Sequence, residues 1–143
     1  MSNDLKTAEE AWAIIVEQAQ EKALNSTRVV HSMEIGQVVR QGDIYIHCVA
    51  ENHLRGKLVQ SRQLAIGNTQ GSRHMVADEI EVYEGTTLPP GCGANTFLGP
   101  CFVVRRRLDD TVTHPEHAWA SLPERTYQVT HQMDARTGKR VKD

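Results

Sequence analysis

The chain has 143 residues, of which 39% are hydrophobic and 24% are charged, and its formal net charge is -2 at pH 7. This length suits a single domain that buries a core without disulfides or a structural metal. The slightly acidic balance argues against a general nucleic-acid binder, because such proteins usually carry a basic excess.

The cysteines and the N-terminus favour a reducing compartment. Cys48, Cys92 and Cys101 form no Cys-x-x-Cys pair, and the first residues are polar and lack a signal peptide. An odd cysteine count without a secretory segment is typical of an intracellular protein, and we expect a cytoplasmic location. The longest uncharged stretch, residues 85–104, is interrupted by glycine and proline, so no membrane span is expected.

The first predicted element is one amphipathic helix over residues 7–25. Thr7 and Glu10 have the spacing of a capping box, in which each side chain satisfies a backbone N–H of the other. Apolar residues recur along one stripe of this helix at the helical period; they are Ala8, Trp12, Ile15, Ala19 and Ala23. We expect this stripe to pack on a sheet, on a protein partner or on a second copy of the chain.

Beyond Ser26 the apolar residues recur at a two-residue period, which predicts a β-domain over residues 28–133 followed by a polar tail over 134–143. The clearest strand is 43–50, which is rich in β-forming residues and follows the turn signal Gln41-Gly42-Asp43. The other strand-like runs are 28–35, 37–40, 57–66, 73–83, 95–107, 118–122 and 127–133. The run 95–107 is expected to be broken or bulged at Gly99-Pro100.

This pattern predicts the fold class. Roughly six to nine short strands with turns about ten residues apart are typical of a β-sandwich or a small β-barrel. The whole chain, residues 1–143, is therefore predicted to be one mainly β domain with an N-terminal helix. No βαβ alternation is present, so a parallel α/β sheet is not predicted.

One candidate site begins at the run His114-Pro115-Glu116-His117. Residues three apart in a strand point to opposite faces, but Pro115 favours a turn that would bring the two histidines together. Glu116 could be a third ligand or could fix the tautomer of one imidazole. The alternative interpretation is a polar surface turn without a ligand.

A second stretch, residues 67–74, would complete that site. His74 adds an imidazole, and Gly67 and Gly71 would let the ligand turn that they form approach the histidine turn closely. Imidazole nitrogens with one carboxylate are suited to a divalent metal such as zinc, iron or manganese. The predicted metal ligands are therefore His74, His114, Glu116 and His117.

Several of these motifs occur together in one group of proteins. Gly42-Asp43, the glycine-rich turn into His74, the run from His114 to His117, and the Leu-Pro-x-x-x-Tyr-x-Val run over 122–129 resemble a group of small uncharacterised bacterial and phage-borne β-proteins. Ser72 stands where that pattern has a first histidine. The order of the paired histidines is also similar to that of cupin metal sites. The resemblance implies a β-fold and a histidine-lined site, and it implies no reaction.

The one dense basic run is Arg105-Arg106-Arg107. Guanidinium groups pair bidentately with phosphates or carboxylates, so this run could bind an anionic partner. The neighbouring Asp109 and Asp110 offer internal partners instead, and strong nucleic-acid binding is not expected.

The sequence favours a small non-enzymatic accessory or binding β-domain with a histidine-lined site. A cupin-like metal-dependent enzyme that uses the same histidines is the first alternative. An interaction module that binds an anionic partner through Arg105–Arg107 is the second.

Overall fold

A computed structural model describes residues 27–64 and 74–132 of the chain. The predicted helix over 7–25, the glycines Gly67 and Gly71 and the tail over 134–143 lie outside the described residues. Within the two described ranges, no helix is long and apolar enough to cross a membrane.

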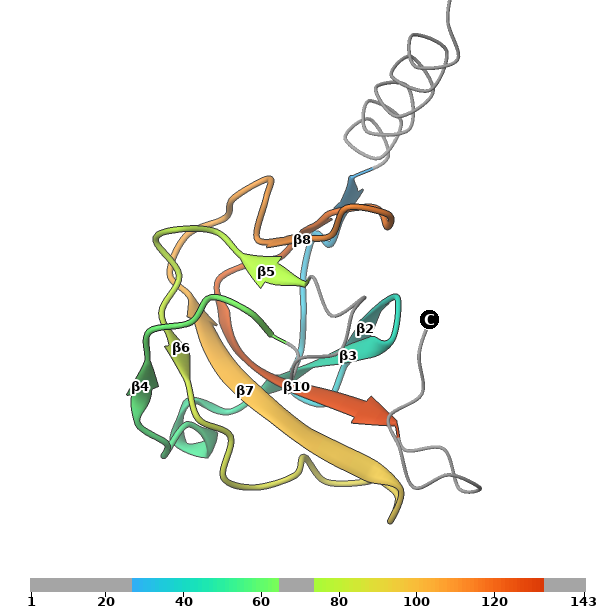
Figure 1. Ribbon diagram of the computed structural model, residues 1–143, viewed down its shortest axis with the longest axis vertical. Helices are drawn as coiled ribbons and strands as arrows, with labels where there is room; N and C mark the ends of the chain where they lie inside the picture. The colour runs from blue at the N-terminus through green and yellow to red at the C-terminus, as the bar shows by residue number, and fades with distance from the viewer. Residues whose placement is uncertain (1–26, 65–73, 133–143) are drawn as a thin grey trace, which may run out of the picture.

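The described residues form two β-sheets (Figure 1). Their elements are β1 (Arg28–Val29), β2 (Val38–Gln41), β3 (Ile44–Val49), the 3-10 helix η1 (Glu51–His53), β4 (Leu58–Val59), β5 (Met75–Val76), β6 (Val82–Tyr83), β7 (Thr96–Val104), β8 (Val112–Thr113), β9 (Ala120–Ser121) and β10 (Arg125–Gln132). The smaller sheet has the order β1-β9-β8-β5, and the larger has the order β2-β3-β10-β7-β6-β4. The mainly β prediction is confirmed, and the described strands do not close into a barrel.

The centre of the larger sheet is β10, which pairs antiparallel with β3 on one side and with β7 on the other. The predicted strand 43–50 is confirmed as β3, and its apolar face is buried, with Ile44 and Ile46 0% exposed. The two-residue period of this strand explains the result, because alternate side chains enter the core.

The irregularity predicted at Gly99-Pro100 is present. Gln128 of β10 pairs with Cys101 and Thr130 pairs with Leu98, so β7 has one extra residue opposite Val129. A side chain at Gly99 would lie 2.9 Å from the Val129 carbonyl oxygen, which is closer than a real Cβ contact. Glycine is therefore required where the two strands pass each other at this bulge.

The run 73–83, predicted as one strand, is divided between the two sheets. β5 belongs to the smaller sheet and β6 to the larger one, and a turn separates them, in which Ile80 N donates to Ala77 O at 3.0 Å. Of the run 57–66, the described residues 57–64 contain only β4 and a single bridge at Gln63. Both runs alternate only partly, and the polar residues inside them favour turns.

Both sheets contribute to one hydrophobic core. The smaller sheet contributes Val76, Val112 and Ala120, and the larger contributes Ile44, Phe102 and Tyr127, among others. The rings of Phe102 and Tyr127 stack with their centroids 5.2 Å apart. The shared core fixes the position of the smaller sheet, and thereby of His74 and His114 beside it.

Candidate functional site

The three histidines predicted to approach one another lie together. His74 immediately precedes β5, His114 immediately follows β8, and His117 ends the turn after it. The ring centroid of His114 lies 4.4 Å from that of His74 and 4.4 Å from that of His117. The rings of His74 and His117 are nearly parallel, with centroids 6.3 Å apart.

His74 is held by two residues of the β2–β3 hairpin. Its side chain is 0% exposed, its Nδ1 lies 2.7 Å from Gln41 Oε1, and its Nε2 lies 2.8 Å from Asp43 Oδ1. The amide nitrogen of Gln41 donates to the carbonyls of Val112 and Ala118, which determines that its oxygen faces His74. The hairpin of the larger sheet is thus hydrogen-bonded to the smaller one.

The protonation of His74 is set by opposing effects. Burial lowers its pKa to about 4, and the hydrogen bond with Asp43 raises it. The neighbouring imidazoles of His114 and His117 lower the pKa further. Both ring nitrogens face acceptor oxygens, which favours a charged ring that donates from both. Burial is the larger effect on the pKa, so the ring is neutral at neutral pH and then donates from one nitrogen only.

The histidine cluster does not have the donor arrangement of a metal centre. Nδ1 of His114 accepts the backbone N–H of Glu116 at 3.0 Å, so the neutral ring carries its proton on Nε2. Both nitrogens of His74 already face oxygen atoms. The side chain of Glu116 is exposed. Among residues 27–64 and 74–132, no group of three or more His, Cys, Asp or Glu side chains is arranged to hold a metal ion.

The arginine run is paired within the protein, although with different partners from those predicted. Arg106 forms a two-pronged contact with Glu79 at 2.9 and 2.5 Å, and Arg105 lies 3.3 Å from Glu81. Arg107 donates to backbone carbonyls, among them that of Val30 at 2.6 Å. Asp109 and Asp110, the expected partners, are not the carboxylates used, because Glu79 and Glu81 come from the neighbouring β5–β6 segment.

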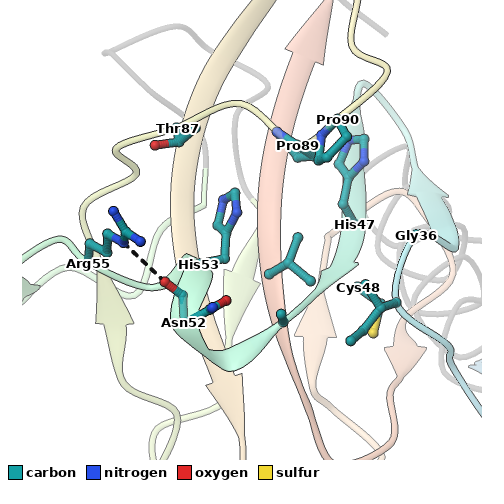
Figure 2. Close-up of a pocket in the computed structure, with 12 residues that line it drawn as sticks. Gly36, His47, Cys48, Asn52, His53, Arg55, Thr87, Pro89 and Pro90 are labelled. Carbon is teal, nitrogen blue, oxygen red and sulfur yellow. Dashed lines mark hydrogen bonds between the residues drawn. The ribbon is translucent and has the colours of Figure 1, made fainter.

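A second candidate site is a cavity of about 400 Å³ lined by residues of β3, of η1 and the segment after it, and of the 87–90 segment. In Figure 2 the rings of His47 and His53 both point toward the Thr87–Pro90 segment, which lies above them. The lining residues include Ile35, His47, Val49, Asn52, His53, Arg55, Thr87, Pro89 and Pro90. This volume is within the usual range for small-molecule sites.

The two histidines of the cavity are each hydrogen-bonded to β10. His47 Nε2 lies 2.8 Å from Thr130 Oγ1, and His53 Nε2 lies 3.1 Å from Gln128 Oε1. Thr130 and Gln128 are two residues apart, so they share the face of β10 that points away from the core. β10 therefore holds both imidazoles of the cavity wall in place, although its own residues do not line the cavity.

Two titratable side chains of the cavity wall, those of His47 and Cys48, are neutral near pH 7. Burial lowers the pKa of His47, and the neighbouring His53 lowers it further. Burial also raises the pKa of the Cys48 thiol, so this sulfur keeps its proton. Arg55 is the one lining residue with a permanent charge.

No family model, no curated protein and no solved structure matches the chain. The resemblance to bacterial and phage-borne β-proteins and to cupin metal sites therefore stays a prediction.

The sequence predicted the histidine cluster and missed its buried partners and the cavity. Gln41 was assigned to a turn, and Asp43 to that turn and to the start of the strand 43–50, although Gly42-Asp43 was among the recognised motifs. His47 and His53 have no motif around them in the sequence. The Leu-Pro-Pro-Gly stretch over 88–91 predicted a loop, and nothing in it indicated that the loop covers a cavity.

Proposed function

We propose that the protein is a small ligand-binding β-domain that holds a small, singly charged anion in the cavity lined by His47, His53 and Arg55. The observation that carries this proposal is the position of Arg55, which lines the cavity and forms no ion pair within residues 27–64 and 74–132.

The surroundings of Arg55 support its role as an anion anchor. Its side chain is exposed, and its Nε donates to Asn52 O at 3.3 Å. Within the described part of the chain, the arginines that form ion pairs are Arg62, Arg105 and Arg106. A guanidinium group outside such pairs keeps donors that can bind a carboxylate or phosphate bidentately.

The cavity wall also suits a ligand with an apolar body. Ile35, Val49, Pro89 and Pro90 give it apolar surface. His47 and His53 each contact β10 through Nε2, which leaves their Nδ1 atoms for hydrogen bonds with a ligand. One permanent positive charge against largely neutral walls is complementary to one negative charge. A carboxylate on a small ring fits this description.

A titration followed by amide NMR tests the proposal, with benzoate as the probe and neutral benzamide as its matched control. We expect saturable shifts for benzoate in the residues around the cavity and weaker ones for benzamide. Arg55→Gln should weaken benzoate binding about tenfold or more, because a hydrogen bond to a charged group contributes roughly 1.5–3 kcal/mol.

The control variant is Arg105→Gln, because Arg105 is also exposed but is paired with Glu81. It should bind benzoate as the wild type does. If the two substitutions weaken benzoate binding equally, the loss reflects only the change in net charge, and the proposal is contradicted. Benzoate binding that requires Arg105 would favour the earlier prediction of an anion site at Arg105–Arg107.

The remaining sequence-based predictions about function are kept as part of this proposal. The thiols of Cys48, Cys92 and Cys101 are free, which supports a reducing location such as the cytoplasm. A binding domain, rather than a cupin-like enzyme, agrees with the donor arrangement at His74 and His114. A protein partner or a second copy bound through the helix over 7–25 stays a prediction.

A further inference from the structure

We infer that the cavity selects anions that also carry a hydroxyl or N–H donor, because Gln128 holds His53 in the tautomer that accepts a hydrogen bond at Nδ1. This inference rests on the proposed function and adds the second chemical group of the ligand. It makes Gln128 a positioning residue, which acts on the ligand through His53.

The orientation of the Gln128 amide is determined by its neighbours. Its Nε2 lies 2.7 Å from Gly99 O, 2.9 Å from Val129 O and 3.2 Å from Pro100 O. Carbonyl oxygens only accept hydrogen bonds, so the nitrogen of the amide must face them. The oxygen Oε1 is therefore on the other side of the amide, toward Cys101 and His53.

Cys101 gives an independent reason for the same orientation. Its thiol donates to Gln128 Oε1 at 2.7 Å. Burial raises the pKa of this thiol to about 11, so it keeps the proton that it donates. The groups on both sides of the Gln128 amide therefore favour the same orientation. Exchanging the positions of its nitrogen and oxygen would break hydrogen bonds on each side.

The tautomer of His53 follows from this arrangement. His53 Nε2 lies 3.1 Å from Gln128 Oε1, which is an acceptor, so Nε2 carries the ring proton. In the neutral ring Nδ1 then has the lone pair, since one nitrogen donates and the other accepts. The ring lines the cavity two residues from Arg55, so the cavity offers an acceptor and a cation from one short segment.

The amide has little freedom to change its orientation. Gln128 is 0% exposed and lies against the bulge at Gly99. Gly85 covers it, since a Cβ at position 85 would lie 3.0 Å from Gln128 Nε2 and would overlap the Gly99 carbonyl oxygen. A buried, satisfied polar network of this kind holds its members in one arrangement.

Two measurements test the inference. Long-range ¹⁵N–¹H NMR at pH 8 should show His53 with its proton on Nε2 in the wild type, and Gln128→Met should lose that preference. In the second measurement, the three hydroxybenzoate isomers are compared with the corresponding fluorobenzoates, which keep the charge and lack the donor. We expect at least one hydroxy isomer to bind about two- to tenfold tighter than its fluoro counterpart, as one net hydrogen bond allows.

In His53→Phe the ratio of hydroxybenzoate to fluorobenzoate affinity should fall to about one. A proton on Nδ1 of His53 in the wild type would overturn the inference without any ligand. If fluorobenzoates bind through Arg55 and no hydroxy isomer gains, the inference fails and the proposed function stands. If none of these anions binds, both fail together.

Discussion

His74 Nε2 lies 2.8 Å from Asp43 Oδ1, and both side chains are almost completely buried. This contact joins the segment before β5 to the β2–β3 turn, which belong to different sheets. The stability of the described fold therefore depends on the protonation state of a buried imidazole.

Acid should destabilise the protein through His74. Burial lowers the pKa of the folded ring to about 4, whereas the unfolded ring titrates near 6.5. Between these values the unfolded state binds a proton that the folded state excludes, so stability is full above about pH 6.5 and is lost as the pH falls toward 4. The loss is at most about 3 kcal/mol, from the free energy of one pKa unit.

Urea unfolding at pH 7.5 and at pH 4.5 measures this loss. His74→Asn should lose part of the difference between the two pH values, and His31→Gln, which changes an exposed histidine, should keep all of it. A wild type that becomes more stable on acidification would mean that the contact with Asp43, rather than burial, decides the pKa.

Gln41 should be one of the most sensitive polar residues in the chain. Gln41→Leu removes the partner of His74 Nδ1 and of the carbonyls of Val112 and Ala118. Buried groups left without a hydrogen bond cost roughly 1–3 kcal/mol each. We expect the free energy of unfolding to fall by about 2–4 kcal/mol. The exposed Gln60→Leu is the control and should change it by no more than about 0.5 kcal/mol.

The sequence predicted this region in part. The turn at Pro115 and the position of His74 were sufficient to predict that three histidines meet, because a proline turn and a glycine-rich turn are local features. The bond from His74 to Gln41 joins residues 33 positions apart and depends on how the two sheets pack. Periodicity cannot supply such a pairing.

The cavity was unpredictable for a related reason. Its walls come from the segments at 35–36, 47–55 and 87–90, which are separate in the sequence. β3 was correctly predicted as a strand because its apolar residues alternate. The alternation places His47 on the opposite face but does not predict what His47 contacts there. Only the pairing of β3 with β10 places His47 beside Thr130.

Elemental analysis of protein purified without a histidine tag should find no stoichiometric metal. The reason is the donor arrangement, since His114 Nδ1 accepts a backbone N–H and both nitrogens of His74 face oxygens. One zinc, iron or manganese ion per chain that His114→Ala removes would establish the predicted ligand set. His31→Ala is the control and should not affect the metal content.

The arginine run should not make the protein a nucleic-acid binder. Arg105 and Arg106 are paired with Glu81 and Glu79, and the net charge is -2. Filter binding at physiological salt should give an affinity weaker than about 10⁻⁶ M, the tight end of the non-specific range. Tighter binding with a steep salt dependence would contradict this, and Glu79→Gln, which releases Arg106, should strengthen whatever weak binding is present.

Benzoate binding in the cavity should strengthen as the pH falls. Burial and the neighbouring His53 lower the pKa of His47, so this ring is uncharged at neutral pH and gains its proton only as the pH falls. Protonation of His47 then adds a second positive charge to the cavity wall that already carries Arg55, and an anion that binds the charged ring more tightly must raise the pKa of His47 in return. Affinity measured by NMR titration from pH 7.5 to pH 5.5 should therefore increase, and His47→Gln should reduce the increase.

The control is His31→Gln, because His31 lies outside the cavity lining, and this variant should show the full increase. Affinity that stays constant over this range in the wild type would show that His47 and the anion are not coupled, and would place the ligand away from His47.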